Sequence, residues 1–333
     1  MAKFTVVHAD ARPNQDLRIE RAELRRVGAR LVATRAEDEA ALIENVRDAD
    51  GIILTFAPIT RRVVESLSHC RVIVRYGVGV DTVDLDAATE RGIVVANVRD
   101  FCTEEVSNHA LMLLLACSRK LALLARSMRD GRWHARPLAP MGSIYGQTLG
   151  IVGMGNIGRV LARKASALGL RIIAHDPYVD PSAATECGAS LVGLDELLRE
   201  ADYVSLNLPL TPETHRLIGA RALRLMKPTA YLINTARGPI VDEAALVDAL
   251  AKGGIAGAGL DVFEEEPLPP GSPLLRLDNV ILTPHTAGYS DESSRRLRLE
   301  VGRAAAAVLA GRWPRYVANP DVQGSIELLP AEV

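Results

Sequence analysis

The chain has 333 residues, of which 48% are hydrophobic, and this length favours two domains rather than one core. Basic and acidic residues nearly balance, 39 against 41, so net charge gives no support for a nucleic-acid or anionic-membrane partner. No signal peptide or membrane-spanning apolar run is visible, and the four scattered cysteines favour reduced thiols in a cytoplasmic protein. The histidines have no ligand spacing with the cysteines, so we expect no metal site.

Short β-branched runs alternate with helical patterns along the whole chain. The first series of expected strands covers residues 4–7, 51–54, 72–74 and 93–95. The second series covers residues 148–152, 171–174, 204–208, 230–234, 256–260 and 280–282. Nearly continuous apolar strands alternating with helices are typical of parallel sheets covered on both faces. The pattern therefore predicts an α/β protein with two doubly wound parallel sheets.

Two long helices stand out beside these strands. A strongly apolar helix is expected over residues 104–124, between the two series, where it would connect the domains. The last helix is expected over residues 291–310, with Ser290 as its N-cap and Gly311 at its end.

A glycine-rich turn follows the expected strand 148–152 and precedes a helical pattern over residues 159–168. Its residues are Gly153, Met154, Gly155, Asn156, Ile157 and Gly158. Gly153 permits a tight turn, Gly155 lets a pyrophosphate approach the backbone, and Gly158 allows close helix–strand packing. Asp176 ends the next strand, where a carboxylate binds the adenosine ribose and favours NAD over NADP, although His175 beside it would soften that preference. We therefore predict an NAD site; a tight turn without a ligand is the alternative.

Polar residues follow three later strands at their carboxyl ends, where ligands bind in a doubly wound sheet. Arg237 follows the strand 230–234, His285 follows the strand 280–282, and Glu264, Glu265 and Glu266 follow the strand 256–260. Hydride transfer to a 2-oxo acid needs a proton donor, a cation for the carboxylate and a partner for the imidazole. Arg237, His285 and one of the glutamates supply these roles. Taken singly, each has a structural alternative: a surface arginine, a satisfied histidine or a solvated acidic face.

The sequence as a whole resembles the D-isomer-specific 2-hydroxyacid dehydrogenase family. The likeness rests on five ordered motifs: GVGVD at residues 77–81, GMGNIG at 153–158, NTARG at 234–238, LDVFEEEP at 260–267 and TPH at 283–285. The resemblance implies that Arg237, Glu266 and His285 are the catalytic residues. It also implies a flavodoxin-like catalytic domain from residues 1–101 and 288–333, an inserted Rossmann NAD-binding domain over residues 102–287, and a homodimer.

The same resemblance assigns further contacts. Those expected for the cofactor are Val106, Leu208, Pro209, Thr214, Thr235, Ala236 and Asp261, the last bonding the nicotinamide carboxamide. Those expected for the substrate are Arg75 and the backbone amides of Gly77, Val78 and Gly79. Additional candidates for the pocket wall are Phe56, Trp133, His134, Gly288 and Tyr289.

Within the family, the chain resembles the C-terminal-binding protein branch most, through residues 283–290 and Arg75. It departs from that branch at Gly288, where a tryptophan is usual, and in lacking the long tail of the animal co-repressors. The phosphate-binding arginine region of phosphoglycerate dehydrogenases corresponds to residues 55–60, which contain no arginine, so a phosphorylated substrate is not expected.

The expected function is therefore reversible, NAD-dependent reduction of a small 2-oxo acid to a D-2-hydroxy acid. Two alternatives remain open at this point. One is an NAD(H)-responsive binding protein, as among co-repressors, and the other is a dehydrogenase of a non-carbon substrate such as phosphite.

Overall fold

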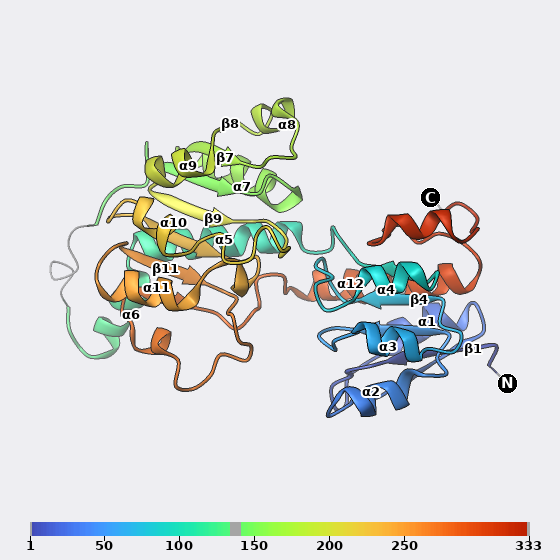
Figure 1. Cartoon of the computed structure of the whole chain (residues 1–333). Coiled ribbons are helices and arrows are strands. Elements are labelled where there is room, and N and C mark those ends of the chain that lie inside the picture. Colours follow the sequence, from blue (N-terminus) through green and yellow to red (C-terminus); the bar gives the residue numbers. More distant parts are fainter. Residues whose placement is uncertain (1, 134–140, 332–333) are drawn as a thin grey trace. The chain divides into compact units, whose positions relative to one another are not determined.

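The computed structural model describes residues 2–133 and 141–331. The chain divides into two compact units, each built on one parallel sheet (Figure 1). Unit 1 comprises the residues up to Phe101 together with those from Ser290, and unit 2 runs from Cys102 to Tyr289. Residues 288 and 289 therefore belong with unit 2 rather than unit 1. The expected α/β class with two doubly wound parallel sheets is confirmed.

Unit 1 holds a five-stranded sheet in the order β2-β1-β3-β4-β5, which is the flavodoxin-like order. Its strands are β1 (Phe4–His8), β2 (Ala29–Ala33), β3 (Gly51–Leu54), β4 (Val72–Arg75) and β5 (Val94–Ala96). Helices α1 (Arg18–Arg25) and α12 (Asp291–Leu309) pack on one face. The other face is covered by α2 (Glu39–Val46), α3 (Arg61–Ser66) and α4 (Leu85–Glu90). A 3-10 helix, η4 (Pro320–Gly324), follows α12.

Unit 2 holds a seven-stranded sheet in the order β12-β11-β10-β9-β6-β7-β8. Its strands are β6 (Thr148–Val152), β7 (Arg171–His175), β8 (Ala189–Leu191), β9 (Tyr203–Leu206), β10 (Tyr231–Asn234), β11 (Gly257–Leu260) and β12 (Val280–Leu282). Strand order reverses between β6 and β9, and such a switch point is where doubly wound sheets bind dinucleotides.

Helices cover both faces of this second sheet as well. One face packs against α5 (Thr103–Ser118) and α7 (Asn156–Ala167). The other packs against α9 (Leu194–Glu200), α10 (Ala220–Leu225) and α11 (Glu243–Ala251). The remaining short elements are α6 (Leu121–Arg129), α8 (Pro181–Thr185), η2 (Gly238–Ile240) and η3 (Pro273–Arg276).

Three features differ from the expected elements. The helix expected over residues 104–124 is two helices, α5 and α6, because Lys120 adopts a left-handed backbone with φ of 51° between them. The strands β2 and β8 were not expected. Each lies at a sheet edge and alternates buried with exposed residues, so neither has the continuous apolar run of a central strand.

The start of α12 was predicted correctly. The Ser290 hydroxyl accepts the Ser293 N–H at 2.9 Å, and the Ser293 hydroxyl accepts the Ser290 N–H at 2.8 Å. This reciprocal capping box satisfies two donors of the first helical turn.

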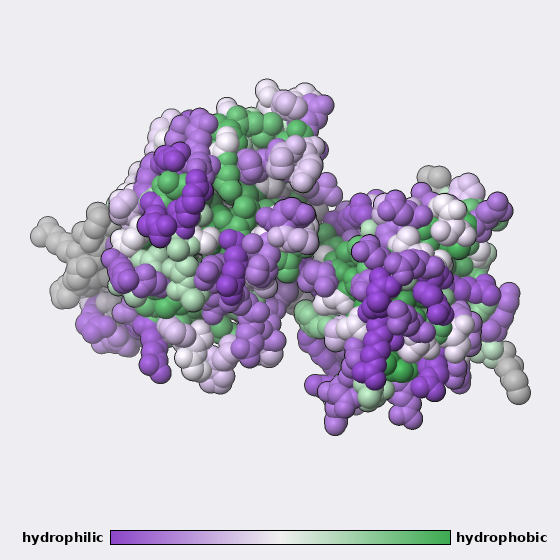
Figure 2. Space-filling view, in the orientation of Figure 1, coloured by the Kyte–Doolittle hydropathy of each residue, from purple (hydrophilic) through white to green (hydrophobic). Residues whose placement is uncertain are grey.

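On the face shown in Figure 2, hydrophilic side chains dominate α2 and α3, while hydrophobic side chains of unit 2 show between its covering helices. Among the described residues, no helix combines the length and hydropathy needed to cross a membrane.

Candidate active site

The glycine-rich turn joins β6 to α7 at the switch point of unit 2. Gly153 has φ of 95°, and a Cβ there would lie 2.5 Å from the Asn207 carbonyl oxygen. A Cβ at Gly158 would lie 2.2 Å from the Gly153 carbonyl oxygen, so helix and turn need glycine at both positions. A Cβ at Gly155 would meet no atom within 4 Å. The N-terminus of α7 therefore opens onto space that a phosphate group can fill.

Asp176 lies just beyond β7 and contacts this turn directly. Its Oδ2 accepts the Met154 N–H at 2.8 Å, and its Oδ1 accepts the Tyr178 N–H at 2.9 Å. The carboxylate is thus fixed beside the turn, at the position where a ribose hydroxyl would donate to it. Asn156 and Ile157 form the first turn of α7.

Two buried oxygens near the carboxyl ends of β9 and β10 have no hydrogen-bond partner within the described residues: Asn207 Oδ1 and Thr235 Oγ1. Unpaired buried polar atoms are costly, so their presence beside the glycine turn fits a polar ligand that bonds them. Leu208 lies against the turn, with its Cβ 3.0 Å from the Cβ position of Gly153. The Thr214 hydroxyl donates to the Pro209 carbonyl oxygen at 2.7 Å and folds the loop back. Together with the open Gly155 position, these residues fit a dinucleotide.

His285 and Glu266 form a direct pair. The Nδ1 atom of His285 lies 2.6 Å from Oε2 of Glu266, whose Oε1 accepts the Phe263 N–H at 3.0 Å. Burial raises the pKa of Glu266, but the bond to His285, the charge of His285, the Phe263 amide and the charge of Arg237 together lower it. Glu266 is therefore an ionised partner for the imidazole, and the hydrogen bond distinguishes it from Glu264 and Glu265.

Arg237 lies in the loop after β10. Its carbonyl oxygen accepts Nδ2 of Asn234 at 2.9 Å, and its Nη1 donates to the Ala236 carbonyl oxygen at 2.8 Å. The Ala236 N–H donates to Asn234 Oδ1 at 3.0 Å, so one buried asparagine fixes the loop backbone from both sides. The positive charge of Arg237 helps to lower the pKa of Glu266. Arg237 therefore belongs to the same group of side chains, at one edge of the sheet, as the His285–Glu266 pair.

Asp261 is fully buried under the loop that carries His285. Its Oδ1 accepts the Thr283 hydroxyl at 2.5 Å and the Thr286 N–H at 3.0 Å, and its Oδ2 accepts the Ala287 N–H at 2.8 Å. His109 Nε2, on α5, lies 2.9 Å from Thr283 Oγ1. A carboxylate can only accept, so Thr283 donates to Asp261 and accepts from His109, which assigns a proton to Nε2 of His109.

Sequence reasoning missed His109. A single histidine in an apolar helix carries no sign of a partner that lies 174 residues away in the chain. Asp261, which was expected to bond the nicotinamide carboxamide, also holds the loop of residues 283–287 through both of its oxygens. Among the described residues, no cluster of three or more His, Cys, Asp or Glu side chains is placed to hold a metal ion.

The expected substrate residues of unit 1 lie at the carboxyl end of β4. Arg75 is buried, and a Cβ at Gly77, where φ is 135°, would lie 1.8 Å from Nη1 of Arg75. Glycine at position 77 therefore makes room for the guanidinium group. The Gly77 N–H donates to the Arg75 carbonyl oxygen at 3.0 Å, whereas the amides of Val78 and Gly79 bond no described residue. Only these last two remain as candidate amide donors for an anion.

The candidates for the pocket wall are scattered. A Cβ at Gly288 would lie 3.8 Å from Cγ2 of Val106, which is buried on α5, so these two positions adjoin. Phe56, Trp133 and Tyr289 are exposed. His134 lies outside the described residues.

Comparison with known proteins agrees with this geometry. Residues 111–287 match the family model described as "D-isomer specific 2-hydroxyacid dehydrogenase, NAD binding domain". The chain is 44% identical over 285 residues to a glyoxylate reductase of Korarchaeum cryptofilum, covering 84% of this chain and 86% of that protein. It is 40% identical to a D-3-phosphoglycerate dehydrogenase of Methanocaldococcus jannaschii, covering 89% of this chain but only 56% of that protein. The crystal structure of an Aquifex aeolicus D-lactate dehydrogenase complexed with NAD and lactic acid superposes with a TM-score of 0.83 at 28% identity, covering 96% of this chain and 98% of that one.

Proposed function

The chain belongs to the D-isomer-specific 2-hydroxyacid dehydrogenase family, and we propose that His285, Glu266 and Arg237 are its catalytic residues. It is an NAD-dependent oxidoreductase that interconverts a 2-oxo acid and a 2-hydroxy acid. The 2.6 Å contact between His285 Nδ1 and an ionised Glu266 carries the assignment, because a histidine–carboxylate pair is the proton donor that carbonyl reduction requires.

NAD binds on the glycine-rich turn. The amides at the N-terminus of α7, above which Gly155 leaves open space, would hold the pyrophosphate, and Asp176 would accept from the adenosine ribose. The Thr235 hydroxyl and the side-chain amide oxygen of Asn207, which have no partner among the described residues, lie at the same edge of the sheet. Val106, Leu208, Pro209, Thr214, Ala236 and Asp261 complete the cofactor contacts that we propose. When bound, the reduced cofactor supplies the hydride that adds to the carbonyl carbon.

His285 supplies the proton. Glu266 on Nδ1 compensates the charge of the imidazolium and fixes the ring, so Nε2 on the opposite side faces the substrate. As the carbonyl carbon gains hydride, its oxygen becomes an alkoxide and takes the Nε2 proton, which leaves neutral imidazole. In the oxidation direction the same nitrogen removes the hydroxyl proton. Arg237 binds the substrate carboxylate and stabilises the negative charge that grows on this oxygen.

Unit 1 offers further groups for a carboxylate. Arg75 provides a cation at the end of β4, and the amides of Val78 and Gly79 provide two donors. Gly77 allows the backbone conformation of this loop, and its N–H already donates to the Arg75 carbonyl oxygen.

We propose a small, unphosphorylated substrate, with glyoxylate as the first candidate. Asp10 supports this choice, because its carboxylate lies beneath the loop after β3 and accepts the N–H groups of Thr55, Phe56 and Ala57 at 2.6–3.1 Å. A phosphate group at that loop would find its amides occupied and an anion beneath them.

The test is NADH oxidation on a panel of glyoxylate, hydroxypyruvate, pyruvate and phenylpyruvate. We expect turnover on at least one, and His285→Ala should lower it about 100-fold or more while leaving the NADH dissociation constant unchanged. Near-normal turnover by that variant would overturn the assignment of His285. NADH binding without turnover on any acid would favour a binding protein, and NADH formation from NAD and phosphite would favour the non-carbon substrate.

We further propose that the protein is a cytoplasmic homodimer. Met112, Leu121 and Met128 leave apolar side chains exposed along α5 and α6 of unit 2, which a second copy would cover. The four cysteines are buried free thiols, as a reducing compartment permits. Light scattering after size-exclusion chromatography measures the oligomeric state, and a monomer would refute the dimer.

A further inference from the structure

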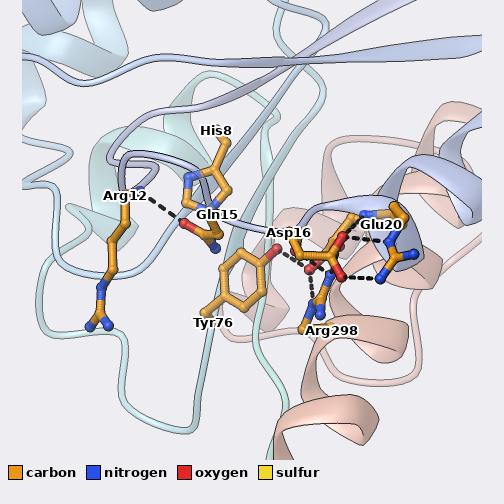
Figure 3. Close-up of polar contacts among 8 residues, drawn as sticks. His8, Arg12, Gln15, Asp16, Glu20, Tyr76 and Arg298 are labelled. Carbon is orange, nitrogen blue, oxygen red and sulfur yellow. Dashed lines mark hydrogen bonds and ion pairs between the residues drawn. The ribbon is translucent and has the colours of Figure 1, made fainter.

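A charged cluster, formed by the buried Glu20 and Tyr76 and the half-buried Arg298, lies at the end of β4 in unit 1 (Figure 3). Glu20 on α1 is fully buried, and its Oε1 accepts both the Tyr76 hydroxyl at 2.9 Å and Nε of Arg298 at 2.8 Å. Its Oε2 accepts Nη2 of Arg298 at 3.1 Å. A buried carboxylate is tolerated only when paired, and here α12 and the residue after β4 supply all three donors.

Tyr76 is the member of this cluster that meets the substrate loop. It lies between Arg75 and Gly77, and its N–H donates to the Leu54 carbonyl oxygen at 2.8 Å. The His8 ring stacks on its ring with centroids 5.2 Å apart. Burial and the charge of Glu20 raise the pKa of Tyr76, so the hydroxyl keeps its proton and donates. Backbone, ring face and hydroxyl are therefore each fixed by a different element.

Stability alone does not account for this arrangement. Replacing a buried ion pair with packed apolar residues is often neutral or stabilising, so the stability of the sheet does not by itself require these charged partners. What the cluster adds is a directional bond on the side chain next to Gly77, at the start of the segment that offers the Val78 and Gly79 amides. Directional bonds fix one loop conformation more sharply than apolar contacts do.

We propose that Glu20 and Arg298 are positioning residues, which act through the Tyr76 hydroxyl to hold residues 77–79 in the conformation that binds the substrate carboxylate. The inference rests on the proposed function of that loop. It predicts that loss of the hydroxyl weakens substrate binding without affecting either the cofactor site or proton transfer, both of which belong to unit 2.

The first test is Tyr76→Phe, which removes only the hydroxyl and leaves Glu20 paired with Arg298. The KM for the best 2-oxo acid of the panel should rise about five- to tenfold, the size of effect expected when one typical hydrogen bond is lost. The value of kcat should stay within about twofold, and the NADH dissociation constant, measured by fluorescence titration, should not change. An unchanged KM overturns the inference.

Tyr203→Phe is the matched control. Tyr203 is equally buried, and its hydroxyl donates to Gln147 Oε1 at 2.7 Å, but it begins β9 at the opposite end of the strand from the cofactor edge. This variant should lower the melting temperature by an amount similar to Tyr76→Phe without raising KM. A rise of KM in both variants would show that loss of stability alone explains the effect, and would also overturn the inference.

A double-mutant cycle tests whether Glu20 acts through the Tyr76 hydroxyl. Glu20→Ala should raise KM at least as much as Tyr76→Phe, and the double variant should be no worse than Glu20→Ala, because both changes break one interaction. Additive effects would overturn the inference. If Glu20→Ala fails to fold, Tyr76→Phe still decides the question.

Arg75→Gln distinguishes this inference from the proposed function of the loop. If Arg75→Gln raises KM while Tyr76→Phe does not, only the inference fails. If neither variant raises KM, the proposed substrate loop fails as well.

Discussion

The backbone N–H of His285 donates to the carbonyl oxygen of Asp261 at 2.8 Å, while the His285 backbone lies in the left-handed region with φ of 50°. A non-glycine residue in this region costs on the order of 1 kcal/mol and persists only where its surroundings hold it. The Asp261 side chain does so through the amides of Thr286 and Ala287. The conformation of His285 is thus set by a buried carboxylate rather than by its own preference.

Thr283→Val should show how much the contacts of Asp261 with this loop contribute to catalysis and to stability. The change removes the hydroxyl that bridges His109 to Asp261 and leaves the half-buried His109 Nε2 only its longer approach of 3.5 Å to Asp261 Oδ1. We expect kcat to fall about tenfold, because the loop no longer holds His285 in one orientation, and the melting temperature to fall by about 3 °C. Steady-state kinetics and thermal unfolding measure the two effects.

Thr185→Val serves as the control for that change. The Thr185 hydroxyl donates to a backbone oxygen on the exposed helix α8, so its loss should leave kcat unaltered. A Thr283→Val enzyme with the wild-type kcat would mean that the His109–Thr283–Asp261 contacts serve stability only.

Glu266→Gln should lower the rate of reduction. The ionised carboxylate, whose pKa is lowered by His285 and Arg237 against the opposing effect of burial, compensates the charge that the ring carries when it donates its proton. A neutral amide can still bond Nδ1 but compensates no charge, so we expect kcat to fall at least about tenfold while the NADH dissociation constant stays unchanged. Steady-state kinetics and fluorescence titration measure the two values, and a wild-type kcat would contradict this role.

The sequence is most informative where chemistry and strand ends coincide. Arg237 and His285 each follow an apolar strand, and the carboxyl ends of parallel strands share one edge, so their proximity was predictable. The choice among three consecutive glutamates was not, since only the hydrogen bond to His285 distinguishes Glu266. His109 was also beyond prediction, because nothing local indicates its contact with Thr283.

The elements that the sequence did not predict are a helix break and two edge strands. The break at Lys120 has no glycine or proline to signal it, so an apolar pattern continuing through residues 104–124 reads as one helix. Edge strands such as β2 need pair with only one neighbour and carry exposed residues, which weakens their apolar pattern.

Gly155→Ala should weaken NADH binding, whereas Gly158→Ala should lower the stability of the protein. Gly155 has φ of −68°, which alanine adopts freely, and its Cβ would meet nothing. This variant should keep its melting temperature but bind NADH at least about tenfold more weakly, because the methyl group occupies the space over the helix N-terminus. At Gly158 the Cβ would lie 2.2 Å from the Gly153 carbonyl oxygen, so the protein should lose stability, by roughly 2 kcal/mol or more.

Thermal unfolding and fluorescence titration of NADH separate these two outcomes. Wild-type NADH affinity in Gly155→Ala would argue against a pyrophosphate at this turn. Wild-type stability in Gly158→Ala would show that the turn can relax away from the helix.

Asp10→Asn should destabilise unit 1 at neutral pH but not in strong acid. Burial raises the pKa of Asp10, yet its contacts with His8 and with the amides of Phe56, Thr55 and Ala57 outweigh burial and lower the pKa from 3.8 to about 2. A lowered pKa in the folded state means that the unfolded chain binds the proton more readily. The resulting stability is fully present above about pH 4 and is lost as pH falls towards 2. The contribution at neutral pH is on the order of 2 kcal/mol.

Urea unfolding at pH 7, 5, 4 and 3 measures this dependence. The free energy of unfolding of Asp10→Asn should be lower than that of the wild type at pH 7 and 5, and the difference should shrink at pH 4 and again at pH 3. Asp16→Asn is the control: Arg18 lowers the pKa of Asp16 to about 2 as well, but that carboxylate is solvent-exposed, and exposed pairs contribute little. A difference for Asp10→Asn that stays constant from pH 7 to 3 would show that its charge is not what anchors the loop after β3.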